Sequence, residues 1–167
     1  MTKLILASLL FASVAHADDK KITIDLNDAA GKKVGTAELS AVPKGVTIAL
    51  DITGLPPGDH AIHVHETAKC DAPDFKSAGG HFNPEHKQHG TGNKQGPHAG
   101  DMPNFNVGKD GKAKTSVIAP GVTLDAGPHG VLNGTALVIH AKADDMKTDP
   151  AGAAGDRIAC GVIAAKK

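Results

Sequence analysis

The sequence predicts an all-β protein, an eight-stranded antiparallel Greek-key sandwich or barrel of the immunoglobulin-like kind. Apolar and polar residues alternate in several short segments, which is the period of a strand buried on one face. The chain contains 20 Gly and 10 Pro, which favour turns and long loops between these segments. Its 167 residues suffice for a single domain with a core.

The first half of the chain shows the alternation clearly. Ile22, Ile24 and Leu26 alternate with polar residues, and a turn sequence follows at 27–31. Because side chains of a strand point alternately to its two faces, this pattern indicates one buried and one solvated face. The strands expected in this half span 22–26, 34–40, 46–52 and 60–66.

The second half contains two long irregular segments between short strands. No periodic pattern survives from 67 to 104, where Gly, Pro, Asn and His dominate, and a second loop precedes the last strand. The expected strands span 105–107, 113–118, 135–141 and 157–164. Almost forty residues without regular structure are unusual in a compact domain unless the loop is functional or cross-linked. The first long loop is therefore predicted to contain a site.

The first 17 residues have the features of a secretory signal peptide. Lys3 precedes an apolar run at 4–14, and Ala15-His16-Ala17 forms a small-x-small cleavage site. The run is shorter than the ~20 residues of a membrane span. We therefore expect a cleaved leader at 1–17, a domain at 18–167 and no membrane insertion. The formal net charge is zero, without a basic stripe interleaved with aromatics, which argues against a nucleic-acid partner.

The chain has two cysteines, Cys70 and Cys160. In an exported protein they imply one disulfide, whose pairing is then forced. A free reactive thiol pair is the alternative, which the wide separation and the lack of a CxxC motif disfavour. A bond closing so long a loop would contribute roughly 4–5 kcal/mol in the chain-entropy account. It would tie the first long loop to the last strand.

The histidines suggest a metal site. His63 and His65 lie two apart on one expected strand, so both point to the same face. An HxH pair alone is weak evidence, but the following loop adds further donors, and three nitrogens with one oxygen suit tetrahedral zinc. These donors are His81, His89, His98 and Asp101. The alternative is a His-rich surface loop, which His86 in the same stretch would fit equally well.

His140 ends the apolar strand segment 136–139. Taken alone, it fits a hydrogen-bonded core histidine better than a ligand. The remaining histidines, His60, His86 and His129, receive no firm role. His60 is expected to satisfy loop backbone groups, and His86 to be exposed to solvent.

Six sequence blocks together resemble the copper–zinc superoxide dismutase family, and the leader resembles its bacterial periplasmic branch. The match runs in order and with similar spacing from about Gly54 to Ile163. The blocks lie at 63–66, 77–84, 87–90, 96–101, 137–145 and 155–161. The resemblance implies the disproportionation of superoxide by alternating Cu(II) and Cu(I), in the periplasm, with superoxide as the small-molecule partner. Monomer and homodimer both remain open.

The resemblance also implies the site, with one copper and one zinc per subunit. Copper would be bound by His63, His65, His81 and His140. Zinc would be bound by His81, His89, His98 and Asp101. His81 would then bridge both metals, Asp144 would link His63 to His89, and Arg157 would guide the anion. Cys70 and Cys160 match the intrachain disulfide of the family.

Two departures and two alternatives accompany this interpretation. Ala61 stands where the family usually has Gly, and Asp156 places a carboxylate beside Arg157, where it would weaken the positive field. One alternative is a non-enzymatic periplasmic copper- or zinc-binding protein on the same fold. The other is a structural sandwich domain with relic ligands, which the complete ligand set disfavours.

Overall fold

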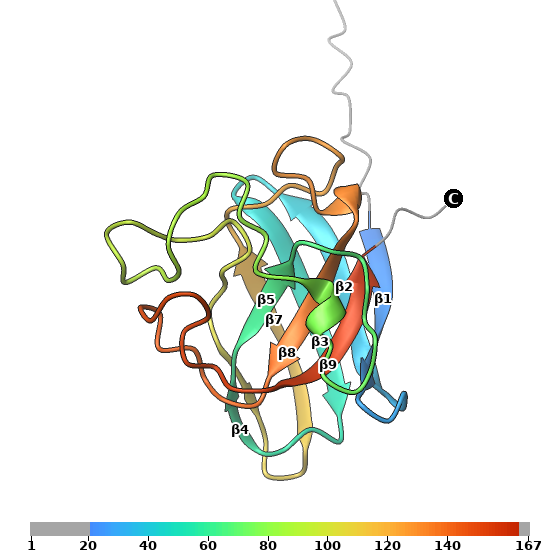
Figure 1. Ribbon diagram of the computed structural model, residues 1–167. Coiled ribbons are helices and arrows are strands. Elements are labelled where there is room, and N and C mark those ends of the chain that lie inside the picture. Colours follow the sequence, from blue (N-terminus) through green and yellow to red (C-terminus); the bar gives the residue numbers. More distant parts are fainter. Residues whose placement is uncertain (1–20, 164–167) are drawn as a thin grey trace, which may run out of the picture.

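A computed structural model describes residues 21–163 of the chain (Figure 1). The predicted signal peptide at 1–17 and the last residue of the predicted strand 157–164 lie outside the described residues. The described part forms nine strands and two short 3₁₀ helices. They are β1 (Lys21–Asp28), β2 (Lys33–Val42), β3 (Gly45–Thr53), β4 (Gly58–His60), β5 (Ile62–His65), η1 (Lys76–Ala78), β6 (Phe105–Val107), β7 (Lys112–Ala119), η2 (Val131–Asn133), β8 (Thr135–His140) and β9 (Arg157–Ile163).

The strands build an antiparallel sheet that curls into a half-barrel, as the sequence predicts. Seven strands pair in the order β5-β8-β9-β1-β2-β3-β7, and β4 pairs separately with β6. The connections from β3 towards β5 and from β7 to β8 cross between the two ends of the large sheet. Alternate residues of β1 and β3 are buried, so the inner face of the curled sheet holds the core. Two long loops project from one side of it (Figure 1).

One expected strand differs from the structure. The segment 60–66 is divided into β4 and β5, which pair with different partners, β6 and β8. The division falls at Ala61, whose N–H donates to the Lys142 carbonyl and whose carbonyl accepts from the His140 N–H. The chain leaves one pairing and enters the other at this residue. The described part therefore has nine strands where the sequence predicts eight.

The first long loop docks against β5, the strand at one end of the large sheet. Val64 exchanges backbone hydrogen bonds with it, donating to Gly100 at 3.0 Å and accepting from Phe82 at 2.8 Å. A disulfide joins Cys70 to Cys160, confirming the predicted pairing and attaching the loop to β9. Within residues 21–163 no helix is long and apolar enough to cross a membrane.

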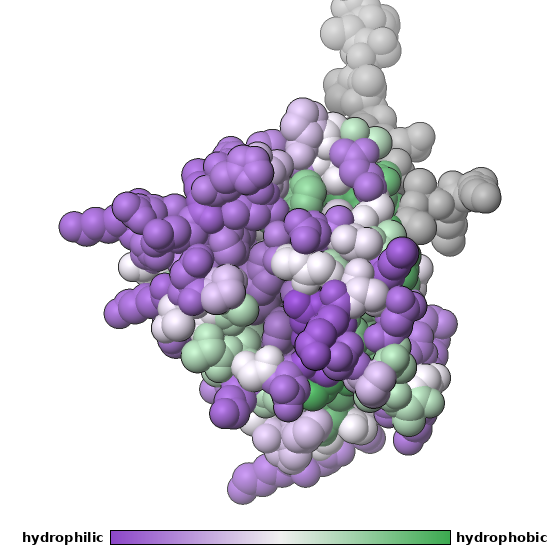
Figure 2. Space-filling model, viewed as in Figure 1, coloured by the Kyte–Doolittle hydropathy of each residue, from purple (hydrophilic) through white to green (hydrophobic). Residues whose placement is uncertain are grey.

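The long loops form a hydrophilic surface. Figure 2 shows polar residues over the two projecting loops, with smaller apolar areas separated among them. Ile118 and Val162 are the large hydrophobic side chains exposed within residues 21–163. The stability of the fold is therefore expected to come from the inner face of the sheet.

Two isoleucines on neighbouring strands test this expectation. Ile48 on β3 is fully buried, whereas Ile118 on β7 is 47% exposed. Ile48→Ala should lower the free energy of unfolding by about 2–5 kcal/mol, because it removes buried apolar surface and leaves a cavity. Ile118→Ala should change it by no more than about 0.5 kcal/mol. Denaturant unfolding of the oxidised, metal-free protein measures both, and equal effects would contradict this account of the core.

Candidate metal centre

Two clusters of buried side chains meet at His81. In each cluster the potential ligand atoms lie within 4.8 Å of one another. The first cluster contains His63, His65, His81 and His140. The second contains His81, His89, His98 and Asp101. The structure thus brings together every side chain that the sequence singles out as a metal ligand.

The sheet positions half of the first cluster. His63 and His65 come from β5, and His140 is the last residue of the neighbouring strand β8. The Nε2 atoms of His65 and His140 are 3.4 Å apart. His81 joins them from the long loop through an isolated β-bridge with His65. Strand pairing therefore fixes three rings, and the docked loop adds the fourth.

Asp101 organises the second cluster. Its Oδ1 atom lies 2.8 Å from His81 Nδ1, 3.1 Å from His89 Nδ1 and 3.3 Å from His98 Nδ1. Ligands about 2.0–2.1 Å from a tetrahedral zinc ion are about 3.3 Å from one another, so these four atoms have nearly the required spacing. The other oxygen, Oδ2, accepts from the N–H groups of Gly90 and His98, which holds the carboxylate in place.

The outward nitrogens of these rings are held as well. Asp144 accepts from His63 Nε2 at 2.7 Å and from His89 Nε2 at 3.0 Å, so it links the two clusters as predicted. His65 Nδ1 donates to the Gly79 carbonyl at 3.0 Å. His140 Nδ1 donates to the Gly155 carbonyl at 3.3 Å. Such contacts fix the orientation of a ligating imidazole and its tautomer.

Two residues support the site without a sequence signal that singles them out. The Asn104 side chain makes paired hydrogen bonds with the backbone of Asp144, at 2.9 and 2.8 Å. His60, whose role the sequence leaves without a firm assignment, lies between the carbonyls of Pro56 and His140 at 2.8 and 2.7 Å. It satisfies backbone groups, as expected. A single Asn in an irregular loop belongs to no periodic pattern, so only the fold reveals its partner.

Unpartnered nitrogens show that the clusters suit metal ions. Among the described residues, His63 Nδ1, His81 Nε2 and His89 Nδ1 are buried without a hydrogen-bond partner. Buried polar atoms are nearly always satisfied in folded proteins. Each of these nitrogens belongs to a ring of one cluster or both, and imidazole nitrogen binds copper and zinc well. The donor set therefore fits a metal ion in each cluster.

Burial sets the protonation of most of these rings. It lowers the pKa of His81 and of His140 to about 4, so both are neutral near pH 7 and able to bind metal. His89 differs, because the carboxylates of Asp101 and Asp144 outweigh the effect of burial and raise its pKa to about 9. Those two carboxylates have pKa values below their usual range, because the contacts with the rings outweigh their burial.

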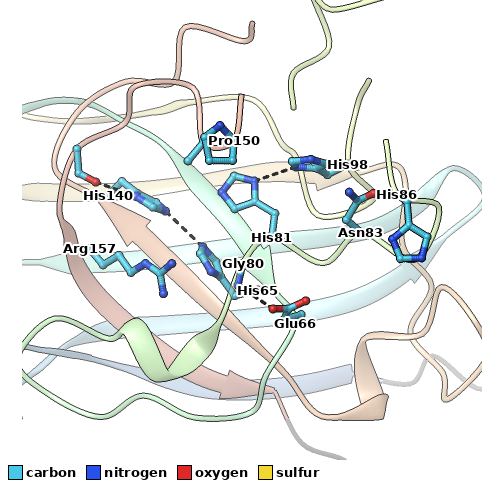
Figure 3. A pocket seen from close by; sticks show the side chains of 12 residues that line it. His65, Glu66, Gly80, His81, Asn83, His86, His98, His140, Pro150 and Arg157 are labelled. Atoms are coloured by element: carbon cyan, nitrogen blue, oxygen red, sulfur yellow. Dashed lines mark hydrogen bonds between the residues drawn. The ribbon is translucent and has the colours of Figure 1, made fainter. Parts of the chain in front are cut away.

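A pocket of about 470 Å³ opens onto the first cluster (Figure 3). His65, His81 and His140 lie in its wall, and the Arg157 side chain points towards them in Figure 3. Arg157 donates to the carbonyls of Phe75 and Gly79, each at 2.7 Å. Gly79 also accepts from His65, so one carbonyl positions both a candidate ligand and the cation. Exposed His86 lies on the pocket rim, and His129 contacts the Gly121 carbonyl instead.

A glycine in the second loop tests how closely this centre is packed. Gly152 has φ +63°, and a Cβ there would collide with the side chains of Asp144 and His89. Gly152→Ala should weaken zinc binding about tenfold or more by displacing Asp144. Gly31, at φ +76° with nothing within 4 Å, is the control, because Gly31→Ala carries the same backbone strain of ~1–2 kcal/mol and should retain zinc affinity. Titration against a zinc chelator measures the difference, and equal affinities would contradict it.

Known proteins share this fold and sequence. The family model for copper/zinc superoxide dismutase matches residues 33–163. Superoxide dismutase (Cu-Zn) 1 from Aquifex aeolicus is 50% identical over 162 residues, which cover 95% of each chain. The crystal structure of a SOD-like protein from Bacillus subtilis has a TM-score of 0.81 at 41% identity, covering 84% of this chain and 96% of that chain. Cu/Zn superoxide dismutase from Brucella abortus gives 0.73 at 32% identity, covering 86% and 99%. The chain belongs to the copper/zinc superoxide dismutase family, whose cofactors are copper and zinc.

Proposed function

We propose that the protein disproportionates superoxide, converting two superoxide anions and two protons into dioxygen and hydrogen peroxide. The observation that carries this proposal is the position of His81, whose ring belongs to both buried clusters and to the wall of the open pocket. A small anion that enters this pocket reaches the first cluster and Arg157 together.

The ligand assignment follows from the clusters. His63, His65, His81 and His140 would hold one copper, and the three rings at 65, 81 and 140 face the pocket. His81, His89, His98 and Asp101 would hold one zinc, in the nitrogen and oxygen set that tetrahedral zinc prefers. Copper, when bound, supplies the one-electron step between Cu(II) and Cu(I), whereas zinc has no accessible redox step.

The protein's own residues account for anion capture and for the proton. Arg157 presents a guanidinium group to the pocket, and its two backbone acceptors hold it there. A fixed cation in a narrow pocket raises the encounter rate with a small anion. The Nε2 atom of His81 can hold a proton between turnovers, while Asp101 keeps the Nδ1 side of the ring oriented.

A non-enzymatic copper- and zinc-binding protein would use the same ligands. It would have no need for an open pocket at the first cluster or for a cation fixed beside it. The approach of Arg157 to His65 through the shared Gly79 carbonyl favours the enzyme. An assay of superoxide consumption by the copper- and zinc-loaded protein distinguishes the two functions.

We also propose export to the periplasm, with cleavage after Ala17 and a mature domain at 18–167. The disulfide between Cys70 and Cys160 supports this location, because such bonds persist in oxidising compartments. Sequencing the N-terminus of protein recovered from the periplasmic fraction tests the proposal. A mature chain that begins at Met1 in the cytoplasmic fraction would contradict it.

Removing one copper ligand tests the assigned centre. His140→Ala should lower superoxide consumption roughly 100-fold or more, since loss of a ligand should cost at least as much as loss of its hydrogen-bond partner. Zinc content should remain at wild-type level, because His140 is outside the second cluster. His129→Ala is the matched control and should keep full activity. Full activity in His140→Ala would overturn the copper assignment.

The carboxylate beside Arg157 provides a test of anion guidance. Asp156 is exposed and lies with Arg157 in a shallow pocket next to the first one. Asp156→Asn should raise the rate at low ionic strength about twofold, with the gain lost at high salt as charges are screened. Asp51→Asn removes an equal charge from β3 and should leave the rate unchanged. An unchanged rate and salt dependence in Asp156→Asn would contradict this role.

A further inference from the structure

Asp149, in the second long loop, contacts two residues of the zinc cluster. Its Oδ1 atom accepts from the backbone N–H of His89 at 2.6 Å. The same oxygen lies 3.9 Å from Nε2 of His98. About half of the Asp149 side-chain surface is exposed, whereas the His98 side chain is almost fully buried. The carboxylate therefore closes the outer side of this cluster.

The outward nitrogen of His98 needs a partner for the same reason as the others. His63 and His89 are both held by Asp144, and backbone carbonyls hold His65 and His140. At the outward nitrogen of His98, the structure places the Asp149 carboxylate. The distance of 3.9 Å is that of an ion pair and exceeds a hydrogen bond, so the contact acts through charge.

The neighbourhood of Asp149 shows that this contact belongs to a docked interface between the two long loops. The N–H of Gly92 donates to the Met146 carbonyl at 2.9 Å, close to the His89 contact in sequence. On the other side, Asn104 holds the backbone of Asp144. The second loop thus meets the first at several points, and Asp149 brings a negative charge to the point nearest His98.

We propose that Asp149 is a positioning residue for zinc, fixing the backbone of His89 and orienting the ring of His98. The role rests on the proposed function, because it requires zinc to bind in the second cluster. A carboxylate at the outward nitrogen of a ligating imidazole fixes the ring orientation and raises its basicity, and loss of such a partner typically weakens metal binding 10–100-fold. Asp149 would thereby couple the second loop to zinc retention.

Zinc transfer to a chromogenic chelator measures this role in the full copper- and zinc-loaded protein. Asp149→Ala should weaken zinc affinity by about tenfold or more, because both contacts are lost. Asp149→Asn should weaken it less, since its amide oxygen still accepts from the His89 N–H but carries no charge towards His98. Asp156→Asn, which removes an equal charge from the same loop away from His98, should retain wild-type affinity.

A spectroscopic measurement separates positioning from a general loss of stability. With Co²⁺ in the zinc site, Asp149→Ala should shift the visible d–d absorption bands, and Asp156→Asn should leave them in place. Wild-type affinity and an unshifted spectrum in Asp149→Ala would overturn the proposal, as would equal weakening by Asp156→Asn. If Asp149→Ala does not fold, unchanged affinity in Asp149→Asn overturns the charge contact with His98. Wild-type protein that binds no stoichiometric zinc would count against the proposed function instead.

Discussion

The burial of several imidazole rings side by side is the constraint on which the rest of the site depends. A buried polar atom without a partner costs about 1–3 kcal/mol, and each ring has two such atoms. The inward nitrogens converge on the two clusters, and the outward nitrogens of His63, His65, His89 and His140 find Asp144 or a backbone carbonyl. The sheet can place only some of these rings, so the loops have to be held against it.

The loops are held by polar and covalent contacts where an apolar core is lacking. The disulfide fixes the first loop to β9, and the Asn104 amide fixes the second loop through the backbone of Asp144. Metal ions that bind only the folded state would add stability by mass action. Because the ligands come from strands and loops far apart in sequence, such binding energy would also be folding energy.

Sequence patterns predicted the strands well and the supporting contacts poorly. Alternation at 22–26 and 46–52 located β1 and β3 to within two residues, because one-sided burial leaves a period of two. The break at Ala61 was missed, since β5 is buried on both faces and shows no alternation there. His63 and His65 were visible from their spacing, whereas Asp144 and Arg157 required the family blocks. Asp149 meets His89 across 60 residues of irregular chain, and no local pattern records such a contact.

The position of β5 at the end of the sheet has a consequence for self-association. An edge strand with free backbone groups is a template for pairing with another chain, and β5 is fully buried and largely apolar between its histidines. Here the first long loop covers that edge, through the hydrogen bonds of Val64 with Gly100 and Phe82. The loop that supplies most of the zinc ligands is thus also the guard of the sheet edge. Protein that loses its metals and lets this loop open would expose β5 to intermolecular strand pairing, so metal loading protects the chain against aggregation.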